Sequence, residues 1–356
     1  MLHKFRNAKC GATVGIESGL HLGFQEQIST GLTASASPIL DEYDRVIVAF
    51  SGGKDSLACL LHLIDQGVDR SKLSLHHNLV DGRESTLMDW PVTEAYCEAI
   101  AKAFGIPINY SYRVGGIERE MLRQDSATAP VSIPTSTGVN RVLGGNGPLG
   151  TRRKFPQVSA SLQSRWCSSA GKIDVFDRYL NNEEMFLDGK TLVVTGERAQ
   201  ESRSRANYKQ FEPHRTDNRN GTKVKRHVDH WRPVHAWTEH QVWDIIKAHR
   251  VNPHVSYLLG WSRASCRACI FSGRNQWATL REIAPQQFNT IAAYEREFKV
   301  TIHRKMSVVA QADAGTPFEC DPFWVEVANS REFNAPVFVD PWILPPGAFG
   351  ESCGPT

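Results

Sequence analysis

The feature that most constrains the fold is the segment VIVAFSGGKDSLACLLHLIDQG, which occupies residues 46–67. Its β-branched residues predict a buried strand at residues 45–50, and its regularly spaced leucines predict a helix at residues 55–66. The loop that joins them, SGGKDS at residues 51–56, holds two glycines, a lysine and two hydroxyls. A glycine-rich turn before a helix suits an anion, because free backbone amides and the helix dipole favour negative charge there.

The side chains of this loop add donors and a full positive charge to the expected anion site. We expect Lys54 to be an exposed loop lysine that meets a phosphate or pyrophosphate group, with Ser51 and Ser56 as further donors. The spacing differs from the G-x-x-x-x-G-K-[ST] loop, in which four residues separate the glycines.

Beyond this unit, strand and helix patterns alternate along most of the chain. Further strands are predicted at residues 73–78, 107–112, 191–195 and 230–237, and helices at 90–104 (capped by Asp89), 116–123, 172–180, 239–249 and 285–298. This alternation predicts an α/β fold, with a parallel sheet covered by helices on both faces. Residues 125–160 and the last 50 residues are rich in proline and small residues, and we expect them to be irregular.

The composition divides the 356 residues into three predicted regions: an N-terminal arm at 1–40, the α/β domain at 41–250 and a cysteine-containing C-terminal extension at 251–356. No stretch approaches the roughly 20 apolar residues of a membrane span, and the N-terminus lacks the apolar core of a signal peptide. We therefore expect a cytoplasmic protein without membrane contacts, in which the eight cysteines are reduced. The net charge of +3 is too small to indicate nucleic-acid binding by itself.

Three cysteines stand out as candidate metal ligands. Cys266 and Cys269 form a C-x-x-C pair, and Cys167 lies about a hundred residues upstream in RWCSSAGKID. In a cytosolic chain such a pair can bind zinc, hold an iron–sulfur cluster or carry out redox chemistry. Cys59 and Cys97 lie within predicted helices and are expected in the core.

The loop SGGKDS closely resembles the signature of the PP-loop ATP pyrophosphatases, which cleave ATP between the α and β phosphates and adenylate a substrate. The resemblance implies an ATP and Mg²⁺ site in which Lys54 and Asp55 are catalytic. The stretches LHHNLVDG and VVTGERAQESRSR resemble the sulfate-activation and sulfonucleotide-reductase branch of this family. The nucleotide-binding residues that these matches imply are Ser51, Gly52, Gly53, Lys54, Asp55, Ser56, Asp81, Gly196, Arg198 and Arg203.

The three cysteines in a PP-loop chain resemble the sulfurtransferases of DNA phosphorothioation systems, the DndC and SspD type, and some tRNA thiolases. That resemblance implies an iron–sulfur cluster, [4Fe–4S], on Cys167, Cys266 and Cys269. The fourth ligand would come from Cys10 or another distant segment, or one iron would be left open. The alternatives are zinc held by the same cysteines and a histidine such as His227 or His230, and a site without metal.

The expected function is therefore an ATP pyrophosphatase that adenylates a substrate oxygen for replacement by sulfur, with a DNA backbone phosphate as the favoured acceptor. Expected partners are a cysteine desulfurase, other modification-system subunits and DNA, which the basic residues of 198–226 and 151–154 could meet. A sulfonucleotide reductase and the small subunit of sulfate adenylyltransferase remain alternatives. A nucleotide-sensing, DNA-binding module without turnover is the alternative of another class. Pyrophosphate release from ATP would separate that module from the ATP-cleaving enzymes.

Overall fold

The computed structural model describes residues 37–159 and 161–350. Most of the predicted N-terminal arm, and with it Cys10, lies outside these residues, as does Cys353. Within the described residues, no helix is both long and apolar enough to cross a membrane.

An eight-stranded sheet forms the centre of the described chain, in the order β5-β4-β3-β2-β1-β6-β8-β7. The five central strands β3, β2, β1, β6 and β8 are parallel to one another, whereas β4, β5 and β7 are antiparallel additions at the edges. The predicted parallel α/β sheet is thus confirmed. The strands are β1 (Arg45–Ala49), β2 (Leu73–Leu79), β3 (Ile108–Arg113), β4 (Val131–Ile133), β5 (Arg141–Leu143), β6 (Lys190–Val194), β7 (Phe211–Pro213) and β8 (His227–Trp231).

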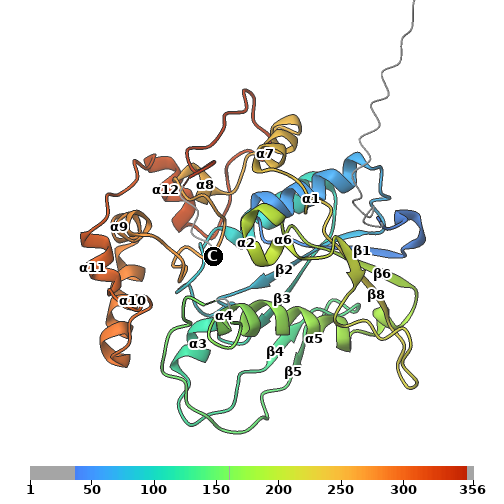
Figure 1. Cartoon of the computed structure of the whole chain (residues 1–356), viewed down its shortest axis with the longest axis horizontal. Coiled ribbons are helices and arrows are strands. Elements are labelled where there is room, and N and C mark those ends of the chain that lie inside the picture. The colour runs from blue at the N-terminus through green and yellow to red at the C-terminus, as the bar shows by residue number, and fades with distance from the viewer. Residues whose placement is uncertain (1–36, 160, 351–356) are drawn as a thin grey trace, which may run out of the picture. The chain divides into compact units, whose positions relative to one another are not determined.

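Helices cover both faces of the sheet: α1, α2 and α7 lie on one face, and α3 and α5 on the other (Figure 1). The α-helices are α1 (Lys54–Asp65), α2 (Thr93–Phe104), α3 (Gly116–Leu122), α4 (Trp166–Ser168), α5 (Asp174–Asn182), α6 (Arg203–Ala206), α7 (Glu239–Ala248), α8 (Val255–Leu258), α9 (Arg274–Ile283), α10 (Pro285–Phe298), α11 (Val308–Asp313) and α12 (Pro322–Asn329). A π-helical turn, Ser169–Ile173, joins α4 to α5, and 3-10 turns cover Leu40–Glu42, Glu184–Leu187 and Ala199–Glu201.

The central strand β1 shows why the sheet is covered twice. Val46 and Val48 pack into the core beneath α1, α2 and α7, whereas Ile47, between them, packs with Phe176 of α5 on the opposite face. All three side chains are buried. Because side chains alternate along a strand, burial of consecutive residues requires apolar cover on both faces.

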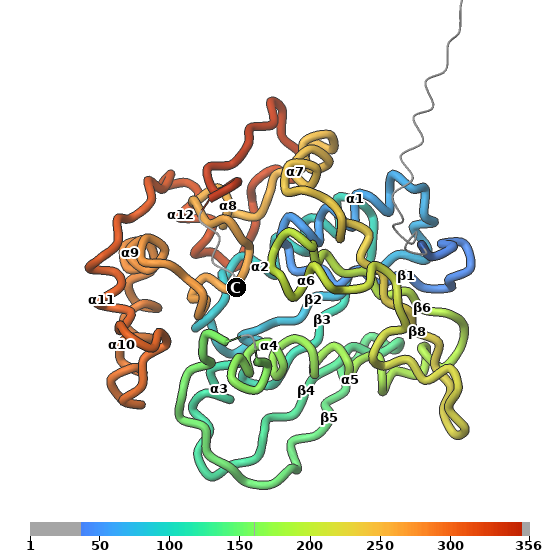
Figure 2. Tube along the Cα trace, viewed as in Figure 1, coloured from blue at the N-terminus to red at the C-terminus, as the bar shows by residue number. Residues whose placement is uncertain are grey.

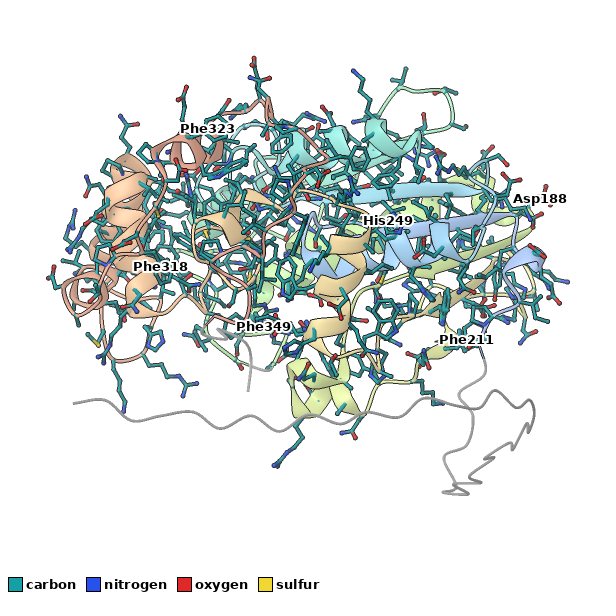
Figure 3. All side chains as sticks on the ribbon, turned by 90° about the horizontal axis from the view of Figure 1, so that it is seen from above. Asp188, Phe211, His249, Phe318, Phe323 and Phe349 are labelled. Carbon is teal, nitrogen blue, oxygen red and sulfur yellow. The ribbon has the colours of Figure 1, made fainter. Side chains whose placement is uncertain are left out.

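The C-terminal helices α8–α12 gather at the end of the sheet to which the parallel strands point (Figures 1 and 2). The amino end of β1 lies on the other side of the molecule. Arg45, the first residue of β1, donates to the backbone oxygen of Asp188, and Figure 3 shows Asp188 on the opposite side from Phe318 and Phe323. Apolar residues that follow β2, including Met88 and Trp90, share cores with these helices. The cysteine-bearing extension is therefore packed against the carboxyl ends of the strands. The region boundaries at 40 and 250 stay predictions.

Several predicted elements differ from the structure. Helix α2 begins at Thr93, not at residue 90, and Asp89 receives the Trp90 amide without being its N-cap. The strand predicted at 230–237 lies at His227–Trp231, and the chain turns after Trp231. The stretch 125–160 contains the short edge strands β4 and β5, and the last 50 residues contain α11 and α12.

Candidate nucleotide and cysteine site

The loop at 51–56 lies where the order of the parallel strands reverses. The chain continues from β1 to β2 on one side, and β6 lies on the other side of β1. In open α/β sheets this reversal opens a crevice at the carboxyl ends of the strands, where ligands bind. The loop follows β1, and Gly196 and Arg198 follow β6, so the topology brings these predicted residues together.

Hydrogen bonds within the loop fix its turn. The Ser56 hydroxyl donates to the Gly53 oxygen at 2.9 Å, and the backbone amide of Gly53 donates to the Ser51 hydroxyl at 3.3 Å. Gly52 has φ +78°, a conformation that residues with a side chain rarely adopt. A Cβ on Gly196 would lie 2.6 Å from the carbonyl carbon of Asp55. The close approach predicted for Gly196 is therefore an approach to the loop itself.

Lys54 and Asp55 are held in a buried ion cluster. The Lys54 ammonium lies 3.1 Å from Asp55 Oδ2 and 3.3 Å from Glu239 Oε1, and Arg198 Nε lies 2.5 Å from Asp55 Oδ1. Burial acts to raise the pKa of Asp55, but Lys54 and Arg198 outweigh it and hold that pKa below its ordinary value. Lys54 is 4% exposed, so the prediction of an exposed loop lysine is wrong. Glu239, which sequence reasoning missed, neutralises the lysine from the first turn of α7.

Two other predicted nucleotide residues lie away from the ion cluster. Arg203 is exposed on α6. Asp81 is buried after β2, where its carboxylate accepts the backbone amides of Met88 and Asp89 at 2.9 and 2.7 Å. Burial raises the pKa of Asp81 to about 7. Asp81 thus organises the turn that leads to α2.

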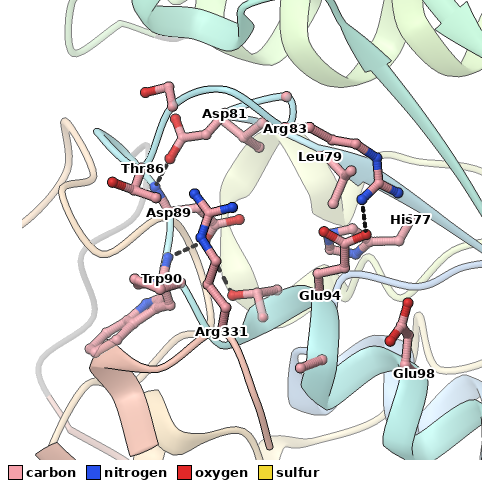
Figure 4. A pocket seen from close by; sticks show the side chains of 16 residues that line it. His77, Leu79, Asp81, Arg83, Thr86, Asp89, Trp90, Glu94, Glu98 and Arg331 are labelled. Atoms are coloured by element: carbon pink, nitrogen blue, oxygen red, sulfur yellow. Dashed lines mark hydrogen bonds and ion pairs between the residues drawn. The ribbon is translucent and has the colours of Figure 1, made fainter. Parts of the chain in front are cut away.

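A polar cavity of about 300 Å³ opens beside this turn (Figure 4). Arg83 forms an ion pair with Glu94 at 2.7 Å on one side, and Arg331 reaches in from the turn after α12. Asp81 lines this cavity and not the one beside the loop. A ribose or Mg²⁺ contact by Asp81 remains a prediction.

A second cavity, of about 260 Å³, lies at the carboxyl ends of β1, β2, β6 and β8. Ser51 lines it at the start of the loop, and Asp89 and Glu197 supply carboxylates. Mg²⁺ is usually held by one or two carboxylates together with substrate phosphates. Glu197 is already paired with Arg232 at 2.6 Å, so a metal that arrives with a nucleotide would have to share that carboxylate.

A third cavity, of about 500 Å³, adjoins the second and is lined by all three predicted cysteines, Cys167, Cys266 and Cys269. Cys266 and Lys172 line both cavities. Lys172 is exposed to solvent within this space, and within the described residues no hydrogen bond or ion pair involves its ammonium group. It belongs to the π-helical turn, a feature that is frequent at functional sites.

Burial favours the protonated form of two of the three thiols, Cys167 and Cys266. Burial and the neighbouring Cys269 raise the pKa of Cys167 to about 11, and burial raises that of Cys266. A metal ion would have to displace these protons. Three half-buried thiols around one cavity are soft donors that suit iron or zinc. Within the described residues, however, no three His, Cys, Asp or Glu side chains already stand in metal-binding geometry.

The other residues named for the metal site lie elsewhere. His227 contacts Asp229 at 3.0 Å, and His230 contacts the Thr195 hydroxyl at 2.7 Å. His230 lines the cavity beside the loop, not the cavity that holds all three cysteines.

Cys59 and Cys97 are fully buried, as predicted for core cysteines.

Much of the basic stretch 198–226 is neutralised within the protein. Arg215 binds Asp177, Arg219 contacts Asp217 at 2.8 Å, and Arg205 pairs with Glu201. In 151–154, Arg152 lies 3.9 Å from Glu120 and Arg153 pairs with Glu297. The basic side chains of 198–226 that are exposed and have no ion pair among the described residues are Arg203, Lys209, Lys223 and Lys225.

One segment of the chain, which contains the three predicted cysteines, is similar to a known protein family. Residues 151–271 match the family model of the phosphoadenosine phosphosulfate reductase domain. This segment contains β6, β8 and the three cysteines but not the loop at 51–56. The match shows similarity to that domain over these residues, and the mostly parallel sheet is consistent with its fold.

A relative with no assigned function also matches. The chain is 25% identical over 268 residues to an uncharacterized 37.8 kDa protein in the gpa 5'region of Escherichia phage 186. The alignment covers 70% of this chain and 74% of the phage protein. It extends the similarity beyond the domain match without adding a substrate.

Proposed function

We propose that this protein is an ATP pyrophosphatase and sulfurtransferase. It adenylates an oxygen of an acceptor molecule, and sulfur then replaces that oxygen. The observation that carries the proposal is the pair of adjoining cavities that share Lys172 and Cys266. One cavity begins at the anion-binding loop, and the other is lined by three thiols. Activation by ATP and delivery of sulfur require two such sites that open to the same acceptor.

In the ATP half, the acceptor oxygen attacks the α phosphorus and pyrophosphate leaves. The loop amides at the N-terminus of α1 would bind the leaving phosphates, and Lys54 would neutralise their charge. Lys54 is already paired with Asp55 and Glu239, so a phosphate would have to share or displace the Glu239 contact. Asp89 and Glu197 would hold Mg²⁺ with the phosphates.

In the sulfur half, a dithiol reductant reduces the persulfide of a cysteine desulfurase to sulfide and is itself oxidised to a disulfide. The sulfide attacks the adenylated phosphorus, and AMP leaves with the former acceptor oxygen. Cys167, Cys266 and Cys269 would hold an iron–sulfur cluster or zinc. A bound cluster would supply a soft iron site for sulfide. Lys172 lies where a cation would attract the anionic acceptor toward the thiols.

A DNA backbone phosphate is the acceptor that we favour. The exposed side chains of Arg203, Lys209, Lys223 and Lys225 are cations without an ion pair among the described residues, and such cations attract phosphates. Partners in a modification system would supply the sulfur and further DNA contacts.

The test measures pyrophosphate release from ATP by the purified protein, with and without duplex DNA. Phosphorothioate in that DNA is then measured after addition of a cysteine desulfurase, cysteine and a dithiol reductant. We expect pyrophosphate release that rises with DNA, and phosphorothioate only when the desulfurase is present. Pyrophosphate release without phosphorothioate in the DNA would contradict DNA as the acceptor and leave ATP cleavage supported. Absence of any pyrophosphate release would contradict it.

A sulfonucleotide reductase is the second candidate, because the matched domain is that of phosphoadenosine phosphosulfate reductase. Such an enzyme would release sulfite from a sulfonucleotide and leave ATP uncleaved. Parallel assays of sulfite and pyrophosphate therefore distinguish the two functions.

A further inference from the structure

Tyr257 of α8 lies directly beneath the nucleotide loop, although 203 positions separate it from Lys54. Its hydroxyl accepts the backbone amide of Lys54 at 2.9 Å, and the side chain is 1% exposed. The ring also packs edge-on against Trp243 of α7, with centroids 5.1 Å apart. The tyrosine is thus fixed on both sides by elements of the loop region.

The amide that Tyr257 holds is one that an anion would use. Lys54 is the first residue of α1, and the first amides of a helix have no partner within the helix. A phosphate at this N-terminus would contact or reorient the same group. Binding at the loop would therefore change the hydrogen bond of the tyrosine.

The same hydroxyl lies beside the segment that leads to the cysteines. Burial raises the pKa of Tyr257, and the Ala264 backbone acts in the opposite direction. A Cβ on Gly53 would lie 3.5 Å from both the Tyr257 hydroxyl and the Ala264 Cβ. Cys266 follows two residues after Ala264. Loop, tyrosine and cysteine segment thus form one packed unit.

The other side of the cysteine segment is held by the turn after β2. The indole of Trp90 donates to the Ser265 oxygen at 3.0 Å, and the Ala268 amide donates to the Met88 oxygen at 2.9 Å. These contacts hold the segment on both sides of Cys266, so only Ser265 separates this cysteine from Ala264 beside the tyrosine.

We propose that Tyr257 is a positioning residue that couples nucleotide binding at the loop to the position of the Cys266–Cys269 segment. This inference rests on the proposed function, since it takes the loop as the site for ATP phosphates. It adds a direct physical connection between the two halves of the reaction. The hydroxyl is its essential part, because the ring alone cannot accept the Lys54 amide.

The test compares Tyr257→Phe with wild type by hydrogen exchange of the backbone amides in residues 262–271, with and without a non-hydrolysable ATP analogue. Tyr96→Phe is the matched control, because Tyr96 is also fully buried, donates to a backbone oxygen and packs against Gly52. In wild type and Tyr96→Phe we expect the analogue to change exchange by about fivefold or more, the lower end of ordinary coupling energies. In Tyr257→Phe we expect little change, although the analogue still binds.

Each result distinguishes the two proposals. If the analogue binds and alters exchange equally in wild type and Tyr257→Phe, direct contact explains the change and the coupling role is overturned. An analogue that binds wild type without altering exchange overturns it as well. If equilibrium binding shows that the wild-type protein does not bind the ATP analogue, both the proposed function and the coupling role of Tyr257 are overturned.

Discussion

At the scale of single residues, the burial of Lys54 decides how its role can be tested. Removing Lys54 takes the ammonium partner from Glu239 and leaves Asp55 with Arg198 alone, so a Lys54 substitution changes stability as well as phosphate binding. We predict that Lys54→Met lowers pyrophosphate release at least about tenfold, because a charged contact to phosphate contributes roughly 1.5–3 kcal/mol. The measurement is pyrophosphate release at saturating ATP, beside a melting curve.

A second substitution separates the two effects. The Lys54→Met substitution leaves the Glu239 carboxylate without its ammonium partner, and Glu239→Gln removes that unpaired charge. The double variant Lys54→Met/Glu239→Gln should therefore melt at a higher temperature than Lys54→Met alone. Its pyrophosphate release should stay low, whereas Glu239→Gln alone should remain active. Recovery of activity together with stability in the double variant would show that Lys54 is structural.

Asp81 gives a pH prediction whose sign is unusual for a carboxyl group. Its pKa in the folded protein, about 7, lies above the ordinary value of 3.8, so the folded state binds the proton more tightly than the unfolded state. The contribution of Asp81 to stability therefore falls as pH rises from about 4 to 7 and stays low above that range. Asp81→Asn should lose stability relative to wild type at pH 5 but regain it toward pH 8. Urea unfolding across this range tests it, and a difference independent of pH would contradict it.

At the scale of elements, the hydrophobic pattern of the sequence predicts those helices and strands whose burial follows from their own residues. The strand at 45–50 and the helix at 285–298 were found because burial and periodicity are contained within each segment. The strand at 230–237 was misplaced because its apolar pattern continues past Trp231, where the chain leaves the ladder before Pro233. Strands β4 and β5 have three residues each, too few to show a period.

The site divides in the same way. The loop at 51–56 is continuous in sequence and was predictable, whereas Glu239 and Tyr257 reach it from about 200 positions away through packing alone. The sequence predicts Lys172 at the start of a helix. Its position beside Cys266 depends on the π-helical turn, which no repeat in the sequence signals. The C-x-x-C spacing makes Cys266 and Cys269 candidates in the sequence, whereas only the fold places Cys167 in the same cavity.

The cysteine segment carries the next prediction. Cys269→Ser replaces a soft thiolate with a hard hydroxyl, so the variant should lose most bound iron or zinc and make no phosphorothioate in cells. Pyrophosphate release should persist at a substantial fraction of wild type, since Cys269 does not line the cavity beside the loop. Metal content after anaerobic purification and both activities are measured. Circular dichroism and melting come first, because metal binding can contribute folding energy.

Cys320→Ser is the control for that variant, because Cys320 is half-buried but contacts the Leu259 oxygen away from the cavity. It should keep both metal and activity. A folded Cys269→Ser that still makes phosphorothioate would contradict a sulfur-handling role for the segment. Loss of metal and ATP cleavage together in a folded protein would instead indicate a structural metal beside the nucleotide site.

At the scale of the whole molecule, charge pairing separates the basic side chains that can meet DNA from those already neutralised. Lys223 and Lys225 are exposed and have no ion pair among the described residues, whereas Arg215 contacts Asp177 at 2.7 Å and Arg153 pairs with Glu297. A cation that binds a phosphate releases a counterion, so its removal lowers the salt dependence of DNA affinity. The net charge of +3 conceals this distinction.

We therefore predict that Lys223→Gln/Lys225→Gln weakens duplex binding and lowers the slope of log affinity against log salt by about two, near 0.9 for each contact. Arg153→Gln/Arg215→Gln, which removes the same charge from paired positions, should leave that slope almost unchanged. The measurement is fluorescence anisotropy of labelled duplex DNA at a series of salt concentrations. Equal slopes in all three proteins would show that the duplex does not contact these lysines, and a loss shared by both variants would mean that net charge alone governs binding.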